Sequence, residues 1–259
     1  MTLSATQRLY LQDDHCFDTD ATVVAVRGSA LAFDRTCFYP GGGGQPPDQG
    51  QVTIGGSTVF EIGSVHADAD GIIWHVCAVA PSSDVVGQSV RLAVDRERRL
   101  ALARYHTVLH VLNTIALRDY GAWITGVQIG VDYSRIDFKW DGFSAALSTA
   151  LEAKVNAVLD ANRPLTSYYI SEDEFRRRED LLRTLEVKPP VMNGKVRVVE
   201  IDGFDAQACG GTHVPTTSYV GRFSIFRVEN KGRINKRLYV RLERPVLSVS
   251  PSGARDLFW

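Results

Sequence analysis

Two pairs of side chains, far apart in the chain, place the strongest constraint on the fold. They are His106 with His110, and Cys209 with His213. A spacing of four residues places two imidazoles on one face of a helix. A cysteine and a histidine four residues apart on a loop can approach the same point from the other side. Together the four side chains offer one sulfur and three nitrogens, a ligand set that suits zinc.

The spacing of apolar residues changes near Asp95. Before it, six short segments rich in Val, Ile, Phe and Thr are separated by Gly and Asp, which predicts strands of a small β-barrel or sandwich. After it, residues 95–121 have helical spacing, with Asp95 as N-cap and Gly121 as the C-terminal stop. We therefore expect two domains, residues 1–94 and residues 95–259.

The second half of the chain alternates helical and strand-like segments, which predicts an α+β domain with a mostly antiparallel sheet. One further helix is expected over residues 144–162 and another over 171–185, where Ser171 and Glu174 match a capping box. The expected strands lie at residues 127–138, 165–170, 195–201, 219–228 and 234–243.

Composition excludes few functions. The net charge of −1 gives no overall sign of nucleic-acid binding, and no apolar run reaches the ~20 residues that a membrane helix needs. The first residues lack the basic and apolar stretches of a secretory signal, so we expect a cytoplasmic protein without a membrane partner. Residues 219–245, however, hold eight basic side chains against two acidic ones. That excess suits either a phosphate backbone or a solvated hairpin.

The ligand pairs leave the role of the metal open. Gly210 and Gly211 would let the loop curl so that Cys209 and His213 face one point. A closed site with four ligands would only hold the helix to the loop. An open site would leave one position to water or substrate, with His213 bound weakly or standing beside the metal as a base.

Four motifs of the chain resemble those of one known protein family. The sequences HTVLH and CGGTH resemble the paired motifs of the alanyl-tRNA synthetase editing domain and its free-standing AlaX-type relatives of medium length. The segment FYPGGGGQPPDQG, residues 38–50, resembles the Gly-rich signature of that family, and RIDF, residues 135–138, resembles its R-x-D-F strand. The resemblance covers roughly residues 20 to 243.

The resemblance implies an N-terminal β-barrel carrying the Gly-rich loop, followed by an α+β editing domain that binds one Zn²⁺ per chain. It implies a zinc-dependent deacylase that hydrolyses the ester of tRNA(Ala) mischarged with serine or glycine. The metal could activate a water or polarise the ester carbonyl. Alternatively it could hold the amino group of the substrate while a separately held water attacks.

Several residues become candidates for the substrate site. In the family the Gly-rich loop lies near the editing pocket, although such a loop could also be a tight turn between strands. Thr125 lies where AlaX-type proteins carry a serine-sensing threonine, and His213 is a candidate base. The candidates for substrate binding in the loop and in the following segment are Gly41, Gly42, Gly43, Gly44, Gln45, Asp48 and Gln128.

The same ligand set would also suit two other functions. A non-catalytic RNA-binding module with a structural zinc would keep the ligands and the basic segment but would lack turnover. A zinc peptidase is disfavoured, because HTVLH lacks the glutamate that such helices carry after the first histidine.

Overall fold

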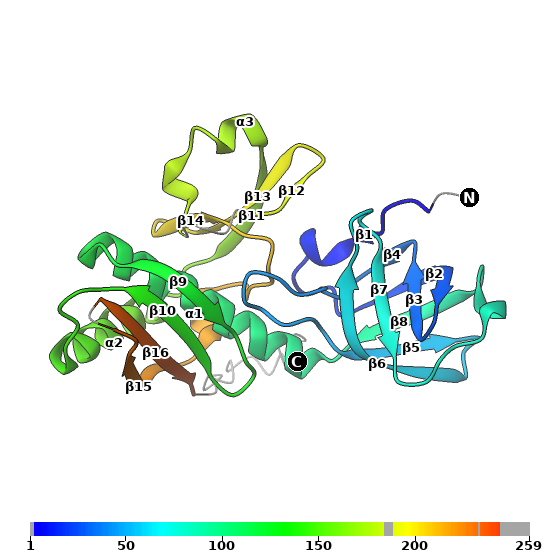
Figure 1. The fold of residues 1–259 in the computed structure, drawn as a ribbon, viewed down its shortest axis with the longest axis horizontal. Helices are drawn as coiled ribbons and strands as arrows, with labels where there is room; N and C mark the ends of the chain where they lie inside the picture. The colour runs from blue at the N-terminus through cyan, green and yellow to red at the C-terminus, as the bar shows by residue number, and fades with distance from the viewer. Residues whose placement is uncertain (1–2, 184–188, 233, 244–259) are drawn as a thin grey trace, which may run out of the picture.

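Strands in the first third of the chain close into a six-stranded antiparallel barrel, as the sequence predicts (Figure 1). The computed structural model describes residues 3–183, 189–232 and 234–243. Inward side chains alternate with outward ones, as in β8, where every second residue is buried. The barrel strands are β2 (Asp18–Arg27), β3 (Ala30–Phe33), β7 (Ile73–Cys77), β6 (Thr58–Ala67), β5 (Gly50–Ile54) and β8 (Ser89–Val94). The short strands β1 (Gln7–Arg8) and β4 (Arg35–Thr36) pair beside it, with 3-10 turns at Leu9–Leu11 and Ser83–Val85.

The helix α1 (Arg96–Tyr120) leads from the barrel into the rest of the molecule (Figure 1). The Asp95 carboxylate accepts a hydrogen bond from the Arg98 N–H, and Gly121 ends the helix with φ 63°. Both predicted caps are confirmed. Its central turns are buried on nearly all sides, so α1 is the structural axis of the second half of the chain. None of the helices in the described ranges is both long and apolar enough to cross a membrane.

One face of a four-stranded sheet packs against α1 and against α2 (Ala145–Asp160). The strand order is β15 (Phe223–Asn230), β16 (Asn235–Leu242), β10 (Ser134–Lys139) and β9 (Trp123–Gln128), all antiparallel. The buried face includes Ile136, Phe138, Leu238 and Val240. We call the opposite face the outer face; its alternate residues include Gln128, Arg135, Asp137, Arg237, Tyr239 and Arg241.

A second antiparallel sheet lies above α1 in Figure 1. It has its own small core around Ile170, Leu181 and Val196. The bend that holds Cys209 follows its strand β14. The strands are β11 (Leu165–Ser171), β13 (Lys195–Ile201), β12 (Val191–Met192) and β14 (Asp205–Ala208). The expected α+β architecture with a barrel and antiparallel sheets is thus confirmed.

Three predicted elements differ. The helix expected over residues 171–185 is only α3 (Glu172–Phe175), followed by a 3-10 turn at Glu179–Leu181; residues 184 and 185 lie outside the described part. Ser171 does accept from the Glu174 N–H at 3.1 Å, but none of the four residues of α3 is buried, so no apolar face extends the helix.

The strand expected over residues 127–138 is a hairpin of β9 and β10, because the chain turns at Gly130. The strand expected from residue 219 begins only at Phe223. A 3-10 turn, Thr217–Val220, precedes it, and Gly221 has φ 81°. Arg233, Arg244 and Pro245 of the basic segment lie outside the described residues.

Candidate metal centre and substrate site

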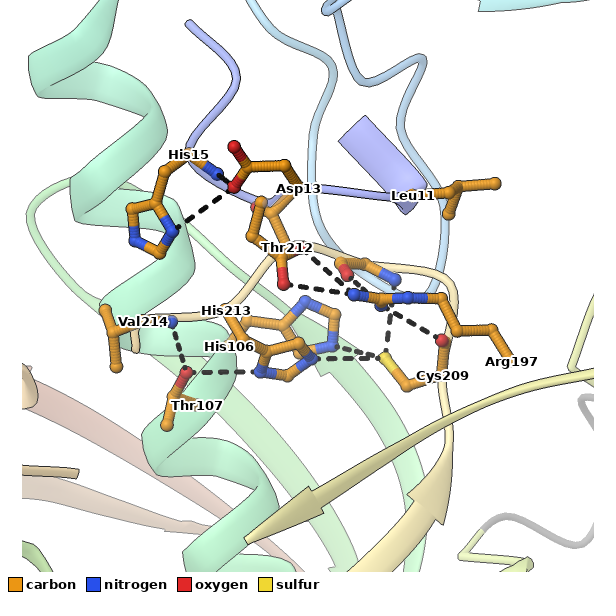
Figure 2. A network of polar contacts seen from close by, with 12 residues as sticks. Leu11, Asp13, His15, His106, Thr107, Arg197, Cys209, Thr212, His213 and Val214 are labelled. Atoms are coloured by element: carbon orange, nitrogen blue, oxygen red, sulfur yellow. Dashed lines mark hydrogen bonds and ion pairs between the residues drawn. The ribbon is translucent and has the colours of Figure 1, made fainter. Parts of the chain in front are cut away.

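The structure brings the two predicted pairs together. Figure 2 shows His106, Cys209 and His213 of this group. His106 and His110 lie one turn apart on α1, and Cys209 and His213 lie on the bend after β14. The ligand atoms of all four side chains lie within 4.8 Å of one another. The Cys209 Sγ is 3.4 Å from the His106 Nε2 and 3.5 Å from the His213 Nε2.

The two sulfur–nitrogen distances fit a single tetrahedral ion. With metal–sulfur and metal–nitrogen bonds of about 2.3 and 2.05 Å, the sulfur–nitrogen edge of a tetrahedron is about 3.5 Å. The three histidines are buried, and Cys209 is half-buried as a residue while its thiol belongs to the buried cluster. The cluster could therefore hold one metal ion.

Burial also sets the protonation of the ligands. It lowers the pKa of His106 to about 4, with a smaller contribution from Arg197, and it lowers the pKa of His110 and His213 well below the ordinary value. The three imidazoles are thus neutral near pH 7, the form that binds metal. Burial raises the pKa of the Cys209 thiol to about 11, so a cation must displace its proton on binding.

Side chains behind the histidines fix the orientation of their rings. The His106 Nδ1 lies 2.7 Å from the Gln45 Oε1, and Gln45 also donates to the Thr212 Oγ1 at 2.8 Å. An amide oxygen only accepts, so Nδ1 carries the hydrogen and Nε2 is left for a metal. The Thr107 Oγ1 lies 3.1 Å from the His213 Nδ1 and orients that ring.

Glycines allow the segments to approach this closely. A Cβ on Gly211 would lie 2.1 Å from the His106 Cε1 and 2.4 Å from its Nδ1. A Cβ on Gly44 would lie 2.8 Å from the Val127 Cγ1, at the edge of β9, where the Gly44 carbonyl accepts from the Ile129 N–H at 2.8 Å. The Gly-rich loop therefore lies between the metal cluster and β9.

The predicted loop residues have different positions. Gly41, Gly42, Gly43 and Gly44 all have positive φ, and Gly42 and Gln45 exchange two backbone hydrogen bonds that close the loop tip. Asp48 is fully buried and pairs with Arg99, while one of its oxygens accepts from the Tyr39 N–H at 2.6 Å. It thus holds the base of the loop to α1.

Thr125 and Gln128 lie on the outer face at β9. Each lines a shallow surface pocket. That of Thr125 also includes Asp137 and Arg237, and that of Gln128 also includes Tyr133, Arg135 and Tyr239. Within the described part of the chain, neither side chain hydrogen-bonds to the His/Cys cluster.

Sequence reasoning missed the residue that shapes the cysteine loop. Arg197 is buried, donates to the Gly211 carbonyl at 2.9 Å and forms an ion pair with Asp14 at 3.0 Å. Its one signal is an arginine within the apolar strand KVRVVEI. Nothing in the local sequence points to Asp14 as its partner.

Two parts of the chain match known families of tRNA synthetase domains. Residues 196–239, which contain Cys209 and His213, match the family described as threonyl and alanyl tRNA synthetase second additional domain. Residues 5–98 match the family described as tRNA synthetases class II (A).

Full-length relatives narrow this class. The chain is 34% identical over 242 residues to the alanyl-tRNA editing protein AlaX-M of Methanosarcina acetivorans, covering 92% of this chain and 99% of that protein. It is 31% identical over 234 residues to the AlaX-M of Saccharolobus solfataricus, covering 90% and 98%. An alanine–tRNA ligase of Korarchaeum cryptofilum is 36% identical over 225 residues, covering 86% of this chain but 24% of the ligase. The chain belongs to the AlaX-M family of alanyl-tRNA editing proteins, which confirms the resemblance predicted from its motifs.

Proposed function

We propose that the protein is a zinc-dependent deacylase that hydrolyses the aminoacyl ester of tRNA(Ala) mischarged with serine, and with glycine as a second substrate. The observation that carries this proposal is the convergence of one thiol and three neutral imidazoles on one point. Membership of the AlaX-M family supplies the substrate class. We also propose the division into a barrel domain, residues 1–94, and an editing domain, residues 95–259.

In this proposal His106, His110, Cys209 and His213 hold one Zn²⁺. A zinc ion there would supply a Lewis acid that acidifies water, polarises the ester carbonyl or holds the amino group of the substrate. We assign His213 as the fourth ligand, because its Nε2 lies as close to the Cys209 Sγ as that of His106 does. Its depressed pKa keeps the imidazole neutral, which is the form that could bind a metal. In the alternative role of a base, the same lowered pKa would make it a weak one.

Selection of the substrate falls to Thr125 and Gln128. Among the described residues neither side chain forms a hydrogen bond, so each has polar atoms free for a substrate hydroxyl. Both side chains are exposed in the protein alone. A site that hydrogen-bonds the hydroxyl of serine would disfavour alanine if the bound substrate covered these polar groups, because they would then stay unpaired. The backbone of Gly41–Gly44 together with Gln45 would form one wall of this site, and Asp48 would support it from behind.

The decisive experiment measures zinc content together with deacylation of Ser-, Gly- and Ala-tRNA(Ala). Cys209→Ala should lose zinc and hydrolysis together, whereas Cys16→Ala, which removes a half-exposed thiol without a histidine partner, should keep both. A wild-type protein that binds zinc and tRNA without turnover would instead be an RNA-binding module. Full deacylation by Cys209→Ala without metal would refute the role of zinc.

A second experiment tests the selecting residue. Thr125→Val keeps the shape of the side chain and removes the hydroxyl, so the preference for Ser-tRNA(Ala) over Ala-tRNA(Ala) should fall. Thr166→Val, on the exposed strand β11, is the matched control and should leave the preference unchanged. Equal preference in wild type and Thr125→Val would remove Thr125 from the site.

A further inference from the structure

The outer face carries three aromatic rings in mutual contact. Tyr133 comes from the turn before β10, Phe226 from a bulge in β15, and Tyr239 from β16. Their ring centroids lie 6.1 to 6.2 Å apart, yet Tyr133 is 50% exposed and Phe226 is 44% exposed. The same sheet buries its other face fully, so these rings are not needed for the core. Clustered aromatic side chains on a solvated sheet face indicate a binding surface.

Positive charge surrounds this aromatic cluster. The Arg241 guanidinium lies 4.6 Å from the Phe226 ring centre, and that of Arg227 lies 5.0 Å from the Tyr239 ring centre. Glu229 pairs with Arg227. Arg241 and Arg135 have no ion pair within the described ranges, so their charges are free for an anion.

The strand register continues this surface toward the metal cluster. Cross-strand pairing aligns Arg227, Tyr239, Arg135 and Gln128 in one row across all four strands. A pocket of about 240 Å³ lies beside the row and is lined by Tyr133, Tyr239, Arg135 and Gln128. The row ends at β9, where the Ile129 N–H donates to the Gly44 carbonyl of the Gly-rich loop. Gln45, which follows Gly44 in this loop, hydrogen-bonds to His106.

We propose that this row and the aromatic cluster bind the single-stranded 3′ end of the tRNA, with a base stacked on Tyr133 and Tyr239 and with phosphates on Arg135 and Arg241. This proposal rests on the proposed function. A single strand is favoured over a duplex, because unpaired bases stack on exposed rings, whereas a duplex offers mainly phosphates. The pocket is also smaller than a site that encloses a drug-sized ligand, which suits one base.

The test measures binding rather than hydrolysis, so its failure can be told from failure of the proposed function. The probe is a fluorescent single-stranded RNA of six nucleotides ending in CCA, titrated with the zinc-loaded protein. Tyr133→Ala should weaken binding by about 5- to 150-fold, the effect of losing one stacked base. Tyr168→Ala, which removes an exposed tyrosine from β11, should leave it unchanged. Arg241→Gln should reduce the salt dependence, log Kd against log salt, by about 0.7.

Unchanged melting temperatures would show that the variants are folded. Two results would overturn the proposal. One is equal binding by Tyr133→Ala and Tyr168→Ala. The other is a blunt RNA duplex that competes as well as the unlabelled single strand. Wild-type protein that binds the probe but does not deacylate charged tRNA would refute the proposed function and leave this surface assignment standing.

Discussion

Gly211→Ala tests the geometry of the metal centre with a single methyl group. The added Cβ would lie 2.1 Å from the His106 Cε1, whereas carbon atoms approach no closer than about 3.5 Å, so the ring must move by about 1.4 Å. Metal–ligand distances tolerate only about 0.2 Å. The φ angle of Gly211 is not in the left-handed region, so the alanine causes no backbone strain, and the effect comes from the collision alone.

The expected loss can be worked out from the ligand count. Four-ligand zinc sites bind with about 10–16 kcal/mol, or about 2.5–4 kcal/mol per ligand, which corresponds to about 70- to 900-fold in affinity. If the loop moved instead of the ring, overpacking would destabilise the fold by about 1–3 kcal/mol. Gly211→Ala should therefore bind zinc about 100-fold more weakly or melt at a lower temperature.

The assay is a competition between protein and a chromophoric chelator for Zn²⁺, together with thermal unfolding of the metal-free protein. Gly63→Ala is the matched control, because a Cβ there meets no atom within 4 Å and its φ is also outside the left-handed region. If both variants bound zinc equally tightly and melted at the same temperature, the His106 ring would not lie in contact with Gly211.

Three further predictions concern other buried groups. Gln45→Ala removes the acceptor that orients His106 and should weaken zinc binding by about 10- to 100-fold in the same competition assay. Burial lowers the pKa of His75 from 6.5 to about 3, so the unfolded state binds the extra proton. The contribution of His75 to stability is therefore fully present above pH 6.5 and is lost as the pH falls toward 3, by about 5 kcal/mol in total. Denaturant titrations should show a shallower fall in His75→Gln. Asp48→Asn leaves a buried arginine unpaired and should cost about 3–5 kcal/mol of unfolding free energy, against about 0–1 for the exposed ion-pair variant Asp20→Asn.

Local sequence rules predicted what is determined by neighbours in the chain. The caps Asp95 and Gly121 are set by backbone groups within one helical turn, so α1 could be bounded closely. Short runs rich in Val, Ile, Phe and Thr between Gly and Asp predicted the barrel strands for the same reason. The helix expected over residues 171–185 was wrong, because its charged residues favour a helix only when an apolar face is buried, and α3 buries none of its residues.

Contacts between distant segments could not be predicted. Arg197 and Asp14 are 183 residues apart, and Asp48 and Arg99 are 51 apart. Both pairs neutralise a charge that burial would otherwise make costly. For Arg197 the sequence shows a charge within a mainly apolar strand but not its partner, and for Arg99 and Asp48 it shows neither signal. The metal ligands were the exception, since their chemistry alone requires them to converge, whatever the intervening chain does.

The Gly-rich loop explains why the barrel and the metal-binding half form one site. Gln45, from the loop, is the group that leaves the His106 Nε2 free for a metal, and Gly44, one residue earlier, bonds to β9 beside Gln128. A shift of the loop would therefore change the orientation of His106 and the wall of the proposed substrate site together. Because Asp48 anchors the same loop to α1 through a buried ion pair, the position of the loop is tied to the helix that carries His106. Residues of the first ninety-four are thus needed for the geometry of a centre whose ligands all come later in the chain.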